Sequence, residues 1–555
     1  MELLSAIANG AWVAGGLREY YRFKRALNSP ADSQAAILRR LLLRHAGSSY
    51  GQKHVFSNIR NYGDFVRQVP LLDYEQAAPW IRRIQQGEAD VLTCGPVLHL
   101  IPTSGSTGPL KLIPFTGGLR DEFNRALAPW IVDLFRQEPS LTLGPAYWSV
   151  SPAIRLGSSE GSAVPIGFDD DSQYLGGTRQ RLVNRVMAAP SALRFIQDTA
   201  TFRYLTLLCL LRHRDLRLIS VWHPSFLTLL LDGLPGHWDE LLTDLRLGSS
   251  ERCRALPESI GRHLELRPMP KRAAELGKLD PRCPGAIWPS LKVVSCWADG
   301  HAALAARELA SRLPGRSIQS KGLLATEAIV TLPFQGGHPV AVESHFFEFI
   351  DATGEVRLVE ELNEGECYDV IVTTSGGLWR YRLNDQVQVT GFIGRTPSLR
   401  FLGRSGNVSD RFGEKLAEAF VGETLRKTLA DHACAPGFAM LAPERANGAW
   451  RYTLFTDVSV PAGFLAVIEA ALRRNPHYDL CRQLGQLEEL AVVAVREGAY
   501  EAYVAREMKH GRRLGEIKPV ALSAREGWSE WFRGRWVEEG TPNEPPHPSP
   551  RPSPH

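Results

Sequence analysis

A chain of 555 residues with a formal net charge of +4 is too long for one compact core and too weakly charged for wholesale nucleic-acid binding. Its composition, 44% hydrophobic and 22% charged, is that of a globular protein, and the length predicts about two to four domains. The eight cysteines are scattered without a CxxC pair. This pattern excludes a disulfide framework or a thiolate zinc site and favours a cytoplasmic location.

The N-terminal segment, residues 1–26, is apolar at first and basic later. A signal peptide carries its charges before its apolar part, so the order is wrong for one. We expect an amphipathic helix packed on the body of the protein, with attachment to a membrane surface as the alternative. The run at 204–211 is far too short to span a bilayer, so no membrane partner is predicted.

Residues 103–111 read Thr-Ser-Gly-Ser-Thr-Gly-Pro-Leu-Lys and lie between two apolar segments. Glycines let a backbone approach a ligand and turn its N–H groups toward it. Hydroxyl groups donate to phosphate oxygens, and the lysine adds a point charge. The composition therefore predicts a loop around a polyphosphate, with a polar turn between two strands as the alternative. It is not a Walker A motif, because no Ser or Thr follows Lys111.

An α/β arrangement is expected between this loop and residue 315. Helical patterns cover 118–136, 179–213 and 221–246. A buried strand is expected at 291–297, followed by a helix over 301–313 that Pro314-Gly315 ends. Such a strand–helix unit is typical of an α/β sheet.

Strand patterns follow one another closely from residue 340 to 403, with glycines between them. Short strands separated in this way predict an antiparallel sheet or a small barrel. The expected strands are 340–350, 355–360, 366–374, 379–382, 386–393 and 398–403.

A polar stretch with glycines at 403–413 predicts a hinge. Helical and strand patterns alternate beyond it, which predicts a compact α+β module able to fold as its own domain. Its expected helices are 414–430, 461–474 and 500–510, and its expected strands are 437–442, 450–457 and 488–496. Residues 539–555 are rich in proline and predict a disordered tail.

Three further clusters carry residues that suit nucleotide chemistry. A Thr-Glu pair at 326–327 suits phosphate through its hydroxyl and Mg²⁺ through its carboxylate, with a helix cap as the alternative. Asp385 closes an Arg-Tyr strand and suits two hydrogen bonds from ribose hydroxyls, with a turn residue as the alternative. Arg404 follows Phe-Leu-Gly just before the hinge, and the alternative to a functional role is a plain surface charge.

In this order along the chain, the motifs resemble the adenylate-forming superfamily and, more closely, the bacterial type of the GH3 family of acyl acid amido synthetases. The loop with its trailing Ile113-Pro114 is similar to that family's phosphate-binding motif. Residues 381–385 look like its Tyr-Arg-x-x-Asp motif, and 345–349 look like its aromatic-Phe-Glu-Phe strand. The resemblance covers residues 20–535. It implies a large N-terminal adenylation domain (1–405) of α/β sheets with a small β-barrel and a smaller, mobile α+β C-terminal domain (406–538).

The resemblance also implies ATP and Mg²⁺ as cofactors and assigns residues to them. The residues implied to bind the ATP phosphates are Thr103, Ser104, Gly105, Ser106, Thr107 and Lys111. Glu327 is the implied Mg²⁺ ligand, with Thr326 beside the α-phosphate, and Asp385 and Arg404 lie at the ribose. Lys518 corresponds to a mobile catalytic lysine. Lys415 is either a second cation near the nucleotide or an exposed residue at a helix start.

This chain departs from the wider pattern at two places. Plant members of the family have Ser-Ser-Glu where this chain has Ala-Thr-Glu, although the threonine keeps the hydroxyl. The superfamily often has aspartate and lysine at the hinge, where this chain has Gly406 and Ser409. The second departure puts a hinge aspartate in doubt.

The implied reaction joins a small-molecule carboxylic acid to an amino acid or another amine. ATP and the acid form an acyl-adenylate and pyrophosphate, and the amine then displaces AMP. An acyl-CoA synthetase with a thiol acceptor is one alternative, and a non-catalytic nucleotide-binding scaffold is another. Tyr147-Trp148-Ser149 and Trp297 are candidates for an acyl pocket that suits an aromatic or apolar acid, with core packing as the alternative.

Overall fold

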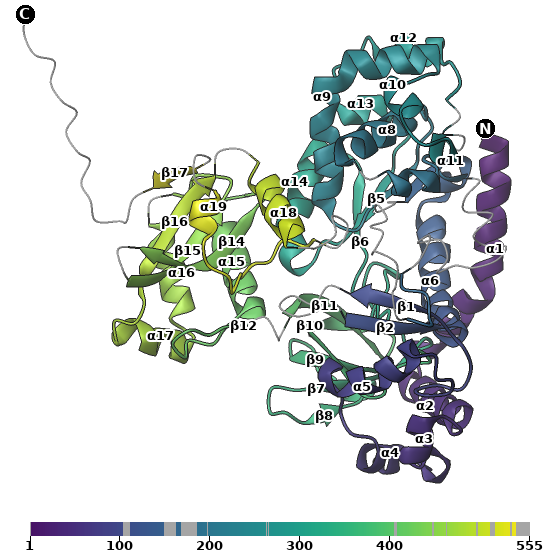
Figure 1. Cartoon of the computed structure of the whole chain (residues 1–555), viewed down its shortest axis with the longest axis vertical. Coiled ribbons are helices and arrows are strands. Elements are labelled where there is room, and N and C mark those ends of the chain that lie inside the picture. Colours follow the sequence, from purple (N-terminus) through teal and green to yellow (C-terminus); the bar gives the residue numbers. More distant parts are fainter. Residues whose placement is uncertain are drawn as a thin grey trace, which may run out of the picture. The chain divides into compact units, whose positions relative to one another are not determined.

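The computed structural model describes two compact units, which divide between Leu402 and Gly403 (Figure 1). None of the helices in the described ranges is long and apolar enough to cross a membrane. The described residues are 2–103, 111–148, 162–167, 186–196, 198–261, 264, 266–404, 408–446, 449–461, 463–495, 498–510, 517–532 and 536–539.

The N-terminal unit begins with helices, and α1 (Glu2–Ala26) packs along α6 (Gly117–Gln137). A Cβ at Gly16 would meet the side chain of Val132 at 2.9 Å, so glycine permits this close approach. The amide of Asn9 donates to the carbonyls of Thr142 and Gly144, both at 3.2 Å. The expected helix packed on the body is therefore confirmed. The helices that follow are α2 (Pro30–His45), α3 (Ser49–Lys53), α4 (Tyr62–Gln68) and α5 (Tyr74–Gln85).

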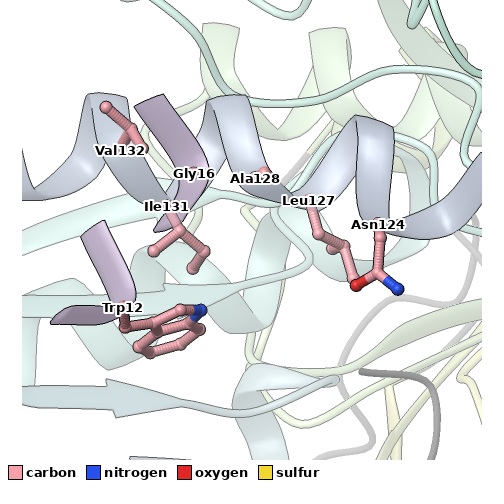
Figure 2. Close-up of a pocket in the computed structure, with 7 residues that line it drawn as sticks. All are labelled: Trp12, Gly16, Asn124, Leu127, Ala128, Ile131 and Val132. Carbon is pink, nitrogen blue, oxygen red and sulfur yellow. The ribbon is translucent and has the colours of Figure 1, made fainter. Parts of the chain in front are cut away.

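A small cavity lies between α1 and α6 (Figure 2). Its volume of about 10 Å³ has room for about one water molecule. The cavity is lined by Trp12, Gly16, Asn124, Leu127, Ala128, Ile131 and Val132. It is too small to serve as an acyl pocket.

A parallel four-stranded sheet forms the second part of this unit, in the order β3-β4-β5-β6. Its strands are β3 (Ala146–Trp148), β4 (Leu218–Ser220), β5 (Val293–Cys296) and β6 (Ser317–Ser320). Helices alternate with them, so the predicted α/β class and the strand–helix unit near 291–313 are confirmed. The helices are α8 (Thr199–Leu211), α9 (Pro224–Leu247), α10 (Glu251–Arg254), α11 (Glu258–Gly261), α12 (Pro270–Leu276), α13 (Pro284–Ile287) and α14 (Ala303–Arg312).

A second, five-stranded sheet has the order β11-β10-β9-β7-β8 and two end strands, so it does not confirm the expected barrel. Its strands are β7 (Phe346–Ile350), β8 (Val356–Arg357), β9 (Cys367–Thr373), β10 (Tyr381–Ile393) and β11 (Thr396–Arg404). Two predicted strands, 379–382 and 386–393, are one strand in the structure. The register of β10 on β9 shifts between Arg382 and Gln386, and Asn384 has a φ of 58°. A bulge therefore stands where the sequence pattern predicts a break.

The second unit is an α+β module, as its sequence pattern predicts. In its four-stranded sheet, β15 runs parallel to β16, whereas β14 and β17 are antiparallel to their neighbours. The strands of this sheet are β14 (Ala439–Ala446), β15 (Ala449–Thr456), β16 (Glu488–Val495) and β17 (Trp536–Glu539). Two further strands, β12 (Val408–Ser409) and β13 (Leu416–Ala417), form a separate antiparallel pair. The helices are α15 (Glu418–Asp431), α16 (Phe464–Leu472), α17 (Pro476–Gln483), α18 (Ala499–Lys509) and α19 (Trp528–Trp531).

Candidate active site

The hydroxyl-rich loop connects an antiparallel pair of strands, β1 (Val97–Thr103) and β2 (Lys111–Thr116). Ser104, Gly105, Ser106 and Thr107 lie outside the described residues. Thr103 pairs directly with Lys111, so the lysine stands where the chain leaves the loop. The Lys111 ammonium lies 5.3 Å from the ring centroid of Tyr74, whose hydroxyl accepts a 2.8 Å hydrogen bond from the backbone N–H of Leu112. Tyr74 of α5 therefore contacts and stabilises the chain where it leaves the loop and enters β2.

Thr326 and Glu327 lie at the tip of a tight turn beyond the end of β6. Leu324 and Ile329 form a bridge, and the N–H of Ala325 donates to the carbonyl of Ala328 at 2.9 Å. Glu327 is only 8% exposed. Within the described ranges, no group of three or more His, Cys, Asp or Glu side chains could hold a metal ion. A Mg²⁺ ion here would take one carboxylate from the protein and its other ligands from phosphates and water, which is its usual mode with nucleotides.

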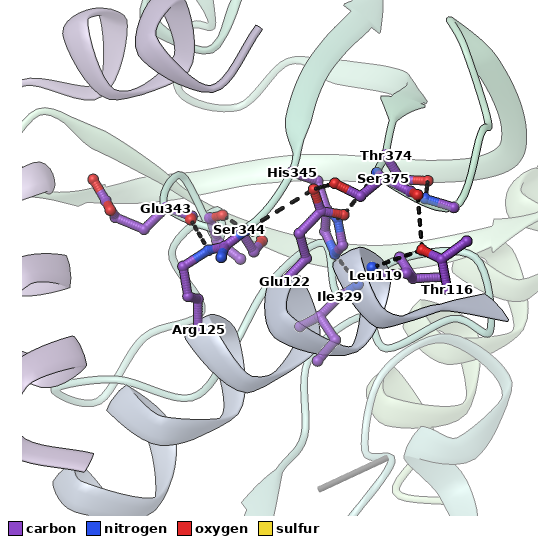
Figure 3. Close-up of polar contacts among 12 residues, drawn as sticks. Thr116, Leu119, Glu122, Arg125, Ile329, Glu343, Ser344, His345, Thr374 and Ser375 are labelled. Carbon is purple, nitrogen blue, oxygen red and sulfur yellow. Dashed lines mark hydrogen bonds and ion pairs between the residues drawn. The ribbon is translucent and has the colours of Figure 1, made fainter. Parts of the chain in front are cut away.

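A buried polar network reaches this turn from α6 (Figure 3). The carboxylate of Glu122 accepts hydrogen bonds from His345 Nδ1 at 3.0 Å, from the Ser375 N–H at 2.9 Å and from the Ser375 hydroxyl at 2.6 Å. The Ile329 N–H donates to His345 Nε2 at 3.3 Å, so the imidazole carries its proton on Nδ1. The network thus joins the helix that follows the loop hairpin to the turn that carries Glu327.

The sequence motifs did not single out Glu122, and they included His345 only as the start of an aromatic strand. A signal for Glu122 does exist, because it lies at helical spacing between the buried Leu119 and Ala126. An ionisable residue on the apolar stripe of a helix requires a buried partner. The sequence alone does not show which residue that partner is.

Asp385 lies within the bulge of β10 and is 4% exposed. Bulges re-aim side chains and occur often beside active sites, so the irregular register is consistent with a functional carboxylate. Glu327, Lys111 and Asp385 all belong to the N-terminal unit.

Glu348, in the motif at 345–349, forms a buried ion pair. The guanidinium of Arg380 contacts both of its carboxylate oxygens, with Nε at 3.0 and 3.1 Å and Nη2 at 2.8 Å. The hydroxyl of Tyr62 donates to the same carboxylate at 2.8 Å. Burial and the neighbouring Glu348 carboxylate raise the pKa of the Tyr62 phenol. The motif glutamate therefore has a structural role that joins β7 to the start of β10.

Three predicted site residues, Arg404, Lys415 and Lys518, belong to the second unit. Lys518 is partly buried, and its backbone carbonyl accepts a 2.9 Å hydrogen bond from the Tyr503 hydroxyl. Lys415 is exposed and has a φ of 45°, and its carbonyl accepts from the Asn475 amide at 3.1 Å. Arg404 ends β11.

The candidate acyl residues differ in burial. Tyr147 is fully buried, whereas Trp148 and Trp297 are partly buried. Trp148 packs on Trp130 with ring centroids 5.9 Å apart, and Trp297 packs on Trp222 with ring centroids 5.4 Å apart. Ser149 lies outside the described residues. Tyr147 is a core residue, and the tryptophans remain candidates.

Family models match nearly the whole chain. The GH3 family N-terminal domain matches residues 19–317, the GH3 family central domain matches 338–404, and the GH3 family C-terminal domain matches 418–526. The chain belongs to the GH3 family. The GH3 C-terminal match begins at the first residue of α15.

Named GH3 relatives are distant but similar over most of their length. A probable indole-3-acetic acid-amido synthetase GH3.12 of Oryza sativa subsp. japonica is 26% identical, covering 69% of this chain and 70% of its own. The indole-3-acetic acid-amido synthetase GH3.17 of Arabidopsis thaliana is 25% identical, covering 80% and 78%. The solved structure of AtGH3.15 acyl acid amido synthetase in complex with 2,4-DB has a TM-score of 0.82 at 19% identity, covering 95% of this chain and 97% of its own. This structural likeness shows that the GH3 fold is shared.

Proposed function

We propose that this GH3 protein is an ATP-dependent acyl acid amido synthetase. Membership of the family and the names of its relatives support the activity. The observation that carries the proposal is the Glu122–His345–Ile329 chain of hydrogen bonds. It fixes the Thr326–Glu327 turn to the helix that follows the hydroxyl loop, as a shared phosphate site requires.

The first half-reaction activates the acid. A carboxylate oxygen of the acid attacks the α-phosphorus of ATP, the bond to the β-phosphate breaks, and pyrophosphate leaves. We infer that the loop hydroxyls and Lys111 hold the phosphates, that Thr326 lies beside the α-phosphate and that Asp385 holds the ribose. The ammonium and hydroxyl donors stabilise the negative charge that develops in the transition state. Glu327 would hold Mg²⁺, which supplies further charge neutralisation when it is bound.

The second half-reaction forms the amide. The amine nitrogen attacks the acyl carbon, the bond to AMP breaks, and the nitrogen loses a proton. We infer a large domain over 1–405 and a small mobile domain over 406–538 that brings Lys518 to the α-phosphate. The division of the structure after Leu402 supports this boundary. Arg404 is proposed to lie near the ribose because of the family resemblance. Lys415 is proposed as a second cation near the nucleotide because it closely follows the hinge.

Two measurements test the proposal. ATP–pyrophosphate exchange that depends on an added carboxylic acid reports the first half-reaction. Product analysis with amino acids and with coenzyme A then identifies the acceptor. A thioester product without amide would replace the proposal by an acyl-CoA synthetase. The absence of exchange over a broad acid panel would favour a nucleotide-binding scaffold.

Asp385→Ala should raise the KM for ATP in the exchange assay by about ten- to hundredfold, because hydrogen bonds to a charged group contribute about 1.5–3 kcal/mol. The KM for the acid should change far less. Glu364→Ala is a matched control, since Glu364 is an exposed carboxylate in the same unit. An unchanged ATP dependence in Asp385→Ala would contradict the ribose role.

A further inference from the structure

Lys321 is a buried cation without an anionic partner among the described residues. It follows β6 directly, and the residue is 3% exposed. Its ammonium donates to the hydroxyl of Ser220 at 2.6 Å and to that of Ser295 at 3.3 Å. The ring centroids of Trp130, Trp148 and Trp222 lie 4.9, 5.5 and 5.7 Å from its nitrogen. Two of its three N–H donors are thus used, and both acceptors are uncharged.

Such a lysine is costly to the fold. Hydroxyl dipoles and indole faces offset only part of the lost hydration of an ammonium. Burial accordingly lowers the pKa of Lys321 to about 7. A methionine of similar length would fill the same space without a charge to desolvate. A role in ligand binding therefore explains a lysine at position 321 better than a contribution to the stability of the fold does.

The surroundings of Lys321 lie where α/β sheets bind ligands. Trp148 is the last residue of β3, and Ser220 is the last residue of β4. Ser295 is the next-to-last residue of β5, and Lys321 directly follows β6. These four strands are parallel, so their carboxyl ends share one edge of the sheet. The turn with Thr326 and Glu327 continues from the same segment of chain.

We propose that Lys321 is a specificity-determining residue of the acyl site and binds a second carboxylate of the acid substrate, remote from the one that is activated. This rests on the proposed acid-activating function. The reacting carboxylate belongs at the Thr326–Glu327 turn, and the second one supplies the counter-charge that Lys321 lacks in the described structure. The tryptophans around the ammonium suit an apolar or aromatic body between the two carboxylates.

The test compares matched acids in ATP–pyrophosphate exchange, which needs no amine. One pair is hexanoate and adipate, and the other is 4-methylphenylacetate and 4-carboxyphenylacetate. The wild type should show a higher kcat/KM for the dicarboxylate of at least one pair. Lys321→Met should lower the ratio of dicarboxylate to monocarboxylate kcat/KM by about ten- to hundredfold. The surface variant Lys427→Met should leave the ratio unchanged.

A wild type that prefers both monocarboxylates, or a ratio that Lys321→Met does not move, would overturn the assignment. Absence of exchange with every acid would instead refute the proposed function, so the two failures are distinct. Selectivity is the decisive readout because a purely structural lysine would change both acids of a pair alike.

Stability provides an independent check. The folded pKa of about 7 lies below the unfolded value of about 10.4, so the unfolded chain binds more protons between these limits. Lys321 should therefore make the wild type more stable as the pH rises from about 7 to 10, and Lys321→Met should abolish that rise. The nearby titratable group is the Cys296 thiol, whose pKa burial raises to about 12. A variant that is less stable than wild type at pH 7 would show that Lys321 is a structural residue and would overturn the proposal.

Discussion

Alanine at Lys518 should slow acid-dependent ATP–pyrophosphate exchange by about two to three orders of magnitude, the usual effect of removing a group that stabilises transition-state charge. The fold should survive, because the Tyr503 hydroxyl bonds to the backbone carbonyl of Lys518 and not to its side chain. Tyr503 itself is held by stacking on Trp528, with ring centroids 5.3 Å apart. The substitution thus removes a charge and keeps this backbone hydrogen bond.

The readout separates catalysis from binding. The kcat for exchange should fall while the KM values for ATP and acid change little, as expected for an interaction made mainly in the transition state. Lys427→Ala is the matched control, since that lysine side chain is 63% exposed and pairs with Glu423 on α15. Exchange in Lys518→Ala at the wild-type rate would rule out the mobile-lysine role.

The elements that sequence reasoning predicts well are those with local signals. The strand–helix unit β5–α14 follows from a short buried run and a helical apolar period, both of which need only neighbouring residues. β10 shows the limit of such signals. Asn384 and Asp385 resemble a turn, and the pattern predicts a break, but pairing with β9 keeps the strand continuous through a bulge.

The candidate site divides in the same way. Glu327 and Asp385 emerge from the order of motifs along the chain and from the family resemblance, since each alone is an ordinary polar residue. No motif assigns a role to Glu122 or to Lys321. Their partners lie far away in sequence, since the sequence separation is 223 for Glu122 and His345 and 101 for Lys321 and Ser220. Only the folded chain brings these groups together, so the cost of burying them becomes visible only in the structure.

Breaking the buried ion pair between Arg380 and Glu348 should strongly destabilise the fold. Arg380→Met should lower the free energy of unfolding by about 3–5 kcal/mol, because it leaves the Glu348 carboxylate buried without its cation. Arg380 and Glu348 have side chains only 4% and 1% exposed, so water cannot replace the lost partner. The Tyr62 hydroxyl would remain as a donor to the carboxylate, which limits the loss without removing it. Urea denaturation at pH 7 measures the change.

A double-mutant cycle decides whether the loss comes from the unpaired charge. Glu348→Gln combined with Arg380→Met should recover part of the stability lost in Arg380→Met alone, since no buried charge is then left without a partner. Additive losses would show instead that Arg380 acts through packing or through its hydrogen bond to the Val69 carbonyl. Because Arg380 directly precedes β10, the cycle also bears on the site. If the pair holds the bulge that carries Asp385, the double mutant should keep an ATP KM nearer to wild type than Arg380→Met does.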